Sequence, residues 1–350
     1  MNVQQALSIL ALGQDLSRDE TREVIKLVMS GETDDAQIGA LLMGLRTKGE
    51  TVDELTGAVE AMRGLSTRVN LNNVPNLVDT CGTGGSGSAK LFNVSTASAF
   101  VTAAAGAHVA KHGNRKMSSS TGSADILEAL GINITISPNQ VAECVTQIGI
   151  GFLFAQAHHS AMRHAATARK ALGIRTLFNL LGPMTNPAGA PHQVIGVFDK
   201  SMIKPMAQVL AQLEAKHVLV VHSPNPDSNI AQGLDEFSLA GHTLVAELKN
   251  GVITEYAISP EEVGLARDDQ TLLQAKTVDD SVRLFNASLS EPESSAARLV
   301  AYNAGASIYA CGLATTFATG VSQAQQAIRS GAAMERLEKL RKLTQSFVSS

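Results

Sequence analysis

Four glycines fall within six positions of one stretch of the chain, at 82, 84, 85 and 87. An apolar run leads into this stretch, and the polar sequence Asn93-Val94-Ser95-Thr96 comes shortly after it, where an alanine-rich helical run begins. Glycines at this density let the backbone come close to a ligand, and a helix start presents free backbone amides. The arrangement therefore predicts a binding site for phosphate or pyrophosphate.

Two widespread nucleotide-binding motifs do not explain this stretch. Gly82, Gly84 and Gly87 have the spacing of the dinucleotide fingerprint, but no helix opens at Gly87 and no acidic residue follows about 20 residues later. A P-loop requires lysine where Ser88 stands. Both interpretations fail on their sequence context.

Two adjacent carboxylates, Asp235 and Glu236, follow an apolar run at 218–221 and an intervening loop. Magnesium prefers hard oxygen ligands, and one or two carboxylates together with substrate phosphates are enough to hold it. Because acidic residues are mostly solvated surface groups, this pair is by itself a weak signal.

The histidines and cysteines show no metal signature. Histidines 158, 159 and 164 lack the His-Glu-x-x-His spacing, so hydrogen-bonding or surface roles are expected for them. The three cysteines are widely spaced and odd in number, which indicates neither a disulfide framework nor a zinc motif. Cys81, beside the glycine loop, is expected to be a small apolar filler, and reduced thiols are typical of a cytoplasmic protein.

Composition limits the partners that can be expected. The net charge is −4, so no global basic field attracts nucleic acid. No run of 18 apolar residues exists, and polar residues interrupt the N-terminal stretch, so neither a membrane span nor a signal peptide is expected. A cytoplasmic protein without nucleic-acid or membrane partners is predicted.

The elements around these residues predict an α/β protein with two parts. Residues 1–65 read as helices only, with capping boxes at Ser17-x-x-Glu20 and Thr51-x-x-Glu54. From residue 77 onward strands and helices alternate, which predicts a mostly parallel central sheet flanked by helices. The expected strands are 75–79, 107–111, 132–136, 149–154, 193–198 and 217–222, with a hairpin at 243–257 around Asn250-Gly251. The expected helices are 95–105, 123–130, 138–147, 159–172, 202–214, 292–312 and 332–347.

These elements predict two domains. A small helical domain is expected over residues 1–72, joined by about 170–190, and a larger α/β domain over 73–169 and 191–350. Residues 174–191 contain three prolines, so they cannot form one regular element and are expected to be a hinge or a crossover between the two domains.

Several motifs follow the glycine loop in a fixed order. They are VAKHGNR at 109–115, SSSTGSADILE at 118–128, GFLFA at 151–155, MRH at 162–164, LGIRTLFNLLGP at 172–183, NPA at 186–188 and GLDE at 233–236. Together with the glycine loop they resemble the anthranilate phosphoribosyltransferase family. The resemblance covers nearly the whole chain, including the helical start and the C-terminal tail.

The resemblance implies transfer of the phosphoribosyl group of phosphoribosyl pyrophosphate to anthranilate, in tryptophan biosynthesis, by a homodimer formed through the helical domain. The residues it implies for phosphoribosyl pyrophosphate are Gly82, Gly85, Ser86, Asn93, Val94, Ser95, Thr96, Lys111 and Ser123. Those implied for anthranilate are Gly82, His112, Asn114 and Arg169, with Arg163 and Arg175 as less certain candidates. Those implied for Mg²⁺ are Ser95, Asp235 and Glu236.

No catalytic acid, base or nucleophile is expected for such a reaction. An aromatic amine is uncharged at neutral pH and attacks without prior deprotonation. Positioning of the substrates and stabilisation of the leaving pyrophosphate then supply the rate.

The chain departs from the family pattern at a few positions. Ser86 stands where the family has aspartate, Gln156 replaces a proline, the glycine loop is one residue longer, and 223–232 resembles an insertion. Two alternatives stay open. One is a pyrimidine nucleoside phosphorylase-like enzyme, which shares a related fold, and the other is a non-catalytic, nucleic-acid-binding relative.

Overall fold

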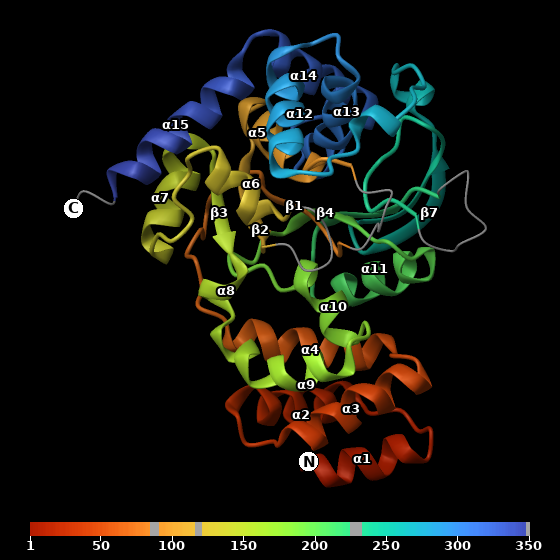
Figure 1. The fold of residues 1–350 in the computed structure, drawn as a ribbon. Helices are drawn as coiled ribbons and strands as arrows, with labels where there is room; N and C mark the ends of the chain where they lie inside the picture. The colour runs from red at the N-terminus through yellow and green to blue at the C-terminus, as the bar shows by residue number, and fades with distance from the viewer. Residues whose placement is uncertain (85–90, 116–120, 225–232, 348–350) are drawn as a thin grey trace.

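The computed structural model describes residues 1–84, 91–115, 121–224 and 233–347. Figure 1 shows two parts, a group of helices that includes the N-terminus and a twisted sheet surrounded by further helices. The first four helices are α1 (Val3–Ala11), α2 (Arg18–Ser30), α3 (Asp35–Lys48) and α4 (Val52–Leu65). From the middle of the chain, α9 (Ala166–Leu172) and α10 (Leu177–Leu181) return to pack against α3 and α4.

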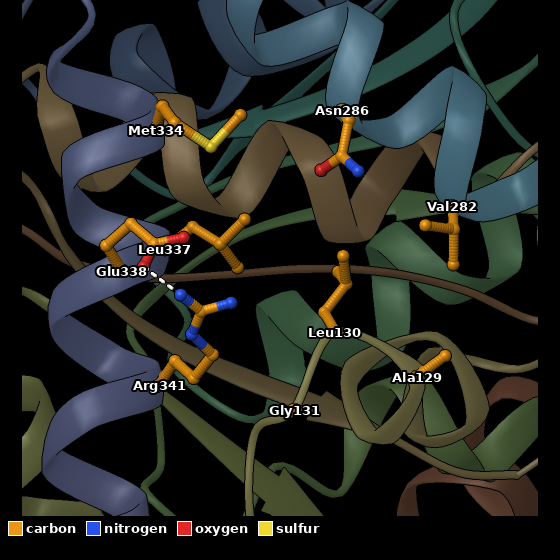
Figure 2. Close-up of a pocket in the computed structure, with 9 residues that line it drawn as sticks. All are labelled: Ala129, Leu130, Gly131, Val282, Asn286, Met334, Leu337, Glu338 and Arg341. Carbon is orange, nitrogen blue, oxygen red and sulfur yellow. Dashed lines mark hydrogen bonds and ion pairs between the residues drawn. The ribbon is translucent and has the colours of Figure 1, made fainter.

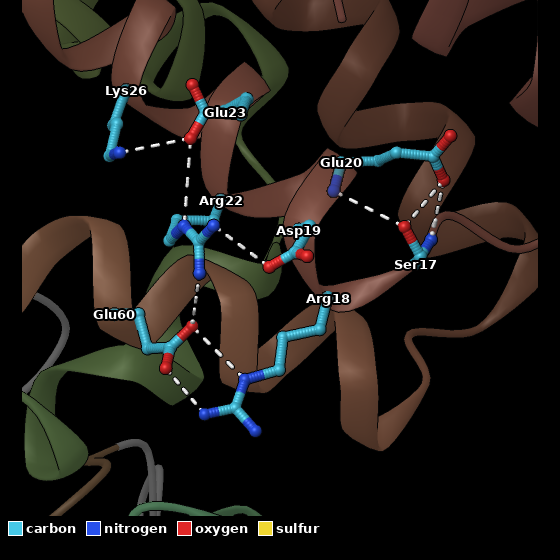
Figure 3. Close-up of polar contacts among 8 residues, drawn as sticks. All are labelled: Ser17, Arg18, Asp19, Glu20, Arg22, Glu23, Lys26 and Glu60. Atoms are coloured by element: carbon cyan, nitrogen blue, oxygen red, sulfur yellow. Dashed lines mark hydrogen bonds and ion pairs between the residues drawn. The ribbon is translucent and has the colours of Figure 1, made fainter.

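Helices α2 and α4 lie in direct contact. Both predicted capping boxes are confirmed at their N-termini. Gly57 permits the contact, because a β-carbon there would stand 2.1 Å from the carbonyl oxygen of Arg18. Arg18 then reaches Glu60 on α4 with Nε 3.1 Å from Oε2, and Arg22 lies 3.5 Å from the same carboxylate (Figure 3). A close backbone approach and a shared carboxylate thus join the two helices.

The sheet has seven strands in the order β3-β2-β1-β4-β5-β6-β7. Their bounds are β1 Leu77–Gly82, β2 His108–Gly113, β3 Ile150–Phe154, β4 His192–Gly196, β5 His217–His222, β6 Thr243–Lys249 and β7 Val252–Ile258. The first five strands in this order pair in parallel, and β6 and β7 are antiparallel. The predicted hairpin is confirmed, and both Asn250 and Gly251 have the positive φ that a tight two-residue turn requires.

The two faces of the sheet bury different helices. Val194 and Leu219 belong to the core that contains α5 (Val94–Ala104) and α13 (Ser295–Ala310). Their neighbours Ile195 and Val220 belong to the core that contains the N-terminal helices and α11 (Ile203–Gln212). Since successive strand residues point to opposite faces, the helical part packs on one face of the sheet and α5 with α13 on the other.

The remaining helices lie around these layers (Figure 1). They are α6 (Ser123–Ala129), α7 (Pro138–Ile148), α8 (Ala155–His158), α12 (Val278–Ser290), α14 (Phe317–Arg329) and α15 (Ala332–Ser346). Of these, α12 and α14 pack against α13 and α5. No helix among the described residues is long and apolar enough to cross a membrane.

The predicted fold class is confirmed, with corrections to single elements. The strand expected at 132–136 is wrong, because that segment is not paired in the sheet and the backbone N–H of Asn133 instead donates to Thr344 Oγ1 on α15, at 3.2 Å. The helix expected at 159–172 is split into a 3-10 turn at Ser160–Ala165 and α9. Helices α12 and α14 were not predicted. The exact domain bounds, at residue 72 and near 170–190, stay a prediction.

Gly57 offers a test of the α2–α4 contact. Gly57→Ala should lower the free energy of unfolding by about 1–3 kcal/mol, because the new methyl group forces the two helices apart. Gly64 lies on the same helix, and a β-carbon there would have no atom within 4 Å, so Gly64→Ala is the matched control. It should be neutral or slightly stabilising. Urea unfolding of both variants measures the difference, and equal stability of the two would contradict the close contact.

Candidate functional site

The carboxyl ends of β1, β2 and β4 meet at one edge of the sheet, where parallel α/β sheets bind ligands. Asp235 comes to this edge from the segment after β5. A β-carbon at Gly82, the last residue of β1, would stand 2.5 Å from Asp235 Oδ2. A β-carbon at Gly196, the last residue of β4, would stand 1.6 Å from the Asp235 carbonyl oxygen. Glycine at both strand ends therefore permits the acidic pair to reach the glycine loop.

The acidic pair contacts both ends of the phosphate-binding stretch. The backbone N–H of Gly84 donates to Asp235 Oδ2 at 2.9 Å, and that of Ser95 donates to Glu236 Oε1 at 3.3 Å. Phe237, the next residue, is fixed through both its backbone N–H and its carbonyl by Asn303 on α13. The pair is thus held in place beside the glycine loop and the start of α5.

The start of α5 carries the polar residues that the sequence singled out. Val94 is the first residue of this helix, and Asn93 precedes it. The Asn93 side chain makes no capping bond, and its Oδ1 instead accepts a hydrogen bond from Thr121 Oγ1 at 2.9 Å. Thr96 Oγ1 donates to Ser123 Oγ at 3.1 Å. The starts of α5 and α6 therefore lie side by side.

Three expectations for this stretch need comment. Ser123, where a helix was expected to begin, is the first residue of α6, and Gly122 is its N-cap. Lys111, expected as the last residue of its strand, lies two residues inside β2. Gly85, Ser86 and residues 225–232 of the predicted insertion lie outside the described residues.

Lys111 is a buried cation with only 2% of its surface exposed. Its Nζ donates to the carbonyl oxygen of Thr80 at 2.7 Å and to Ser95 Oγ at 3.5 Å. Burial lowers the pKa of Lys111, and the negative charge of Asp79 on β1 opposes that shift. Burial also raises the pKa of Asp79, while Lys111 opposes it. Lys111 on β2 thus connects β1 and the start of α5 through its hydrogen bonds, with the buried charge of Asp79 nearby.

A cavity of about 510 Å³ opens between this edge and the helical part. Every residue that the sequence assigned to the acceptor lines it, namely Gly82, His112, Asn114 and Arg169. Met62 of α4 and Cys81 of β1 contribute apolar surface, and burial raises the pKa of the Cys81 thiol well above its usual value. Gly82 is also the start of the glycine loop, so the cavity and the phosphate-binding stretch meet there.

Two histidines on the wall are held by the turn at Gly182–Met184 and its neighbour Thr185. His112 Nδ1 lies 3.2 Å from the carbonyl oxygen of Gly182, and the backbone of Thr185 bonds His159. The two rings meet edge to face with centroids 5.2 Å apart. Burial, together with the proximity of His159, holds the pKa of His112 well below its usual value, and burial lowers that of His159 to about 4. Both are therefore uncharged at neutral pH.

Three arginines lie near the cavity, and they differ in surroundings. Arg169 lies with its guanidinium carbon 5.5 Å from the centre of the Phe178 ring, and no acidic side chain of the described residues forms an ion pair with it. Arg163 also lines the cavity, and its Nη1 lies 3.4 Å from the carbonyl oxygen of Ser160. Arg175 lies outside it, over the ring of Phe198 at 3.7 Å. Arg169 and Arg163 thus both line the cavity without an ion pair among the described residues, whereas Arg175 does not line it.

Sequence reasoning missed several wall residues. Met62, Thr83, Phe178 and Thr185 line the cavity, but no role was assigned to them. Phe178 lies in the LGIRTLFNLLGP motif, which carried the resemblance and could have indicated it. Gln156, the departure from the family pattern, also lines the cavity and donates from Nε2 to Asn114 Oδ1 at 3.4 Å.

Two further cavities among the described residues contain none of the predicted acceptor or metal residues except Arg175, one of the less certain acceptor candidates. One of about 390 Å³ lies between the end of α6, α12 and α15, and Figure 2 shows Leu130 and Arg341 on its wall. The other, of about 160 Å³, lies where α3 meets Arg175 and the segment after β4. The sheet edge with its adjoining large cavity is therefore the candidate active site.

Comparisons with known proteins match both parts of the chain to one family. The profile of the glycosyl transferase family a/b domain matches residues 74–334, and that of the family's helical bundle domain matches residues 4–66. An anthranilate phosphoribosyltransferase of Saccharophagus degradans is 54% identical over 344 residues, covering 97% of this chain and 98% of that protein. A protein of the same name from Hydrogenovibrio crunogenus is 50% identical and covers 99% of this chain and 100% of its own length.

Solved structures of anthranilate phosphoribosyltransferases also superpose on nearly the whole chain. The crystal structure of anthranilate phosphoribosyltransferase from Thermus thermophilus superposes with a TM-score of 0.89 at 40% identity, covering 97% of this chain and 99% of that one. The Saccharomyces cerevisiae enzyme in complex with PRPP and Mg superposes with a TM-score of 0.85 over 98% of both chains. Because the Saccharomyces cerevisiae enzyme is 22% identical to this chain, its similarity shows a shared fold alone.

Proposed function

The chain belongs to the glycosyl transferase family as an anthranilate phosphoribosyltransferase, and from this premise we propose which of its residues hold each substrate. It transfers the phosphoribosyl group of phosphoribosyl pyrophosphate to anthranilate, giving N-(5-phosphoribosyl)anthranilate and pyrophosphate in tryptophan biosynthesis. The pyrimidine nucleoside phosphorylase and the nucleic-acid-binding relative are set aside, because the curated relatives carry the transferase name over their full length.

Phosphoribosyl pyrophosphate binds, in this proposal, at the carboxyl edge of the sheet. Its phosphates lie against the amides of the glycine loop and of the α5 start, where the helix dipole favours negative charge. The residues assigned to it are Gly82, Gly85, Ser86, Asn93, Val94, Ser95, Thr96, Lys111 and Ser123. The observation that supports this is the convergence of the two helix starts, Lys111 and the acidic pair at one edge.

The chemistry of Asp235, Glu236 and Ser95 suits Mg²⁺, because all three offer hard oxygen atoms close together. Within the described part of the chain no three acidic, histidine or cysteine side chains group into a metal cage, so substrate phosphates would complete the shell. Bound there, the ion would neutralise charge on the leaving pyrophosphate.

Anthranilate binds, in this proposal, in the large cavity, with Arg169 pairing with its carboxylate. A guanidinium suits this partner because its planar fork matches two carboxylate oxygens. Asn114 and His112 flank the ring, and Gly82 leaves the cavity open toward the ribose. The single observation that carries the assignment is that these four residues, far apart in sequence, line one cavity which meets the glycine loop.

The protein's own part in the reaction is then to bind the two substrates, to orient them and to neutralise the charge of the phosphates. Backbone amides and Lys111 hold the phosphates, and the acceptor cavity presents the amine to ribose C1. The C1–oxygen bond to pyrophosphate breaks as the C1–nitrogen bond forms, and the nitrogen then releases one proton to water. Positioning supplies the rate, consistent with an uncharged aromatic amine as nucleophile.

A homodimer through the helical part is proposed as well. Leu12, Met43 and Ile174 expose large apolar side chains on or beside α1, α3 and α9, and such side chains favour a protein interface. Light scattering should give about twice the chain mass of 36.6 kDa, and a monomer mass at micromolar concentration would contradict the dimer.

The cytoplasmic location stays a prediction.

The acidic pair tests the proposed metal site. Asp235→Ala combined with Glu236→Ala should abolish most of the Mg²⁺-dependent consumption of anthranilate, followed by its fluorescence in the presence of phosphoribosyl pyrophosphate. Its melting temperature should fall little, because neighbouring carboxylates repel one another without a cation. Equal losses of activity and of stability would instead identify the pair as structural.

Arg169 tests the acceptor site. Arg169→Ala should raise the anthranilate KM about ten- to a hundredfold, because a charge-assisted hydrogen bond of this kind contributes roughly 1.5–3 kcal/mol. The KM for phosphoribosyl pyrophosphate should change little. Arg169→Lys should recover only part of the loss, since lysine lacks the planar fork. Lys111→Ala is the matched comparison and should weaken the phosphate substrate first. An equal effect of Arg169→Ala on both substrates would assign it to the hinge.

A further inference from the structure

A fully buried carboxylate, Asp79, lies on β1 two residues before Cys81. Its Oδ1 accepts the backbone N–H of His112 at 3.0 Å, and its Oδ2 accepts Nδ2 of Asn186 at 2.7 Å. His112 belongs to β2, whereas Asn186 follows the turn at Gly182–Met184. The two oxygens of one side chain therefore tie together two separate parts of the acceptor cavity wall.

Both the nitrogen and the oxygen of the Asn186 side chain are hydrogen-bonded within the protein. It is 3% exposed, and Nδ2 also donates to the carbonyl oxygen of Ala110 on β2 at 2.8 Å. Its Oδ1 accepts the backbone N–H of Ala188 at 2.8 Å. Because buried polar groups are costly to leave unpaired, this side chain has one satisfied arrangement, and that arrangement holds the segment against β1 and β2.

The segment anchored by Asn186 forms a continuous part of the wall. Gly182, Pro183 and Thr185 all line the cavity. Their turn is held further by Gln193 Nε2, which donates to the Pro183 carbonyl at 2.9 Å, and by Arg63 Nε, which donates to that of Met184 at 2.8 Å. Arg63 belongs to α4, so this hydrogen bond also joins the helical part to the turn that lines the cavity.

We propose that Asp79 and Asn186 are a positioning pair for the acceptor, which fixes the distance between His112 and the Gly182–Thr185 wall. Neither side chain lines the cavity, so both act through the residues they hold. Hydrogen bonds to a buried carboxylate are stronger than neutral ones, which makes this contact suited to resist widening of the cavity. The inference rests on the proposed placement of anthranilate there.

The test separates this role from general destabilisation. Asn186→Ala should raise the anthranilate KM about tenfold, the loss expected when one charge-assisted hydrogen bond no longer orders the wall. The KM for phosphoribosyl pyrophosphate should stay within about twofold, because Lys111 and the α5 start keep their own contacts. Asn186→Ser is the milder variant should the alanine variant fold poorly. Asp79→Asn should raise the KM for anthranilate and the KM for phosphoribosyl pyrophosphate, since Lys111 then loses the negative charge near it.

Leu340→Ala is the control for stability. Leu340 is buried on α15, away from the cavity, so its truncation should destabilise the fold and leave both KM values unchanged. If Asn186→Ala shifted both KM values equally or neither, the positioning role would be wrong. Arg169→Ala, measured in parallel, distinguishes the two ideas. If Arg169→Ala left the anthranilate KM unchanged, the placement of anthranilate in the cavity would be wrong. If Arg169→Ala raised this KM and Asn186→Ala did not, only the positioning pair would be wrong.

Discussion

The close approach of Asp235 to the ends of two strands is the constraint on which the site depends. The backbone of Asp235 lies against Gly196 of β4, and its carboxylate lies against Gly82 of β1, where any side chain would collide with it. Because of this approach, an acidic pair from beyond β5 reaches the glycine loop and the start of α5. The loop and the helix start come from one stretch of the chain and the carboxylates from another, and the parallel sheet aligns their positions.

Buried charge is the second organising feature. Asp79 and Lys111 have almost no exposed surface, and each lies near the other within the sheet edge. Buried charges are not a strong source of stability, since desolvation offsets much of their attraction. Their contribution is to fix the neighbouring segments, because each buried charge must keep its hydrogen bonds. Lys111 thereby faces Ser95, and Asp79 holds His112 and Asn186.

The helical part supplies one side of the acceptor cavity as well as covering a face of the sheet. Met62 of α4 lines the cavity, and α9 brings Arg169 to it. Arg63, one residue after Met62, holds the turn that forms another stretch of the wall. The junction between the two parts is therefore the acceptor site that we propose, and a shift of one part against the other would change its width. The residues proposed for phosphate binding, by contrast, all belong to the α/β part.

The sequence by itself determined the fold class and the family. It also predicted a phosphate-binding stretch, because a glycine loop followed by a helix start is a local feature whose geometry follows from neighbouring residues. Helix caps such as Ser17 with Glu20, and the turn at Asn250-Gly251, were predictable for the same reason. Only the tertiary structure decided which residues share the acceptor cavity, that Lys111 is buried, and that Asp79 meets Asn186. Those contacts join segments that are distant in the chain, and neither spacing nor composition records which distant side chains a packed sheet brings together.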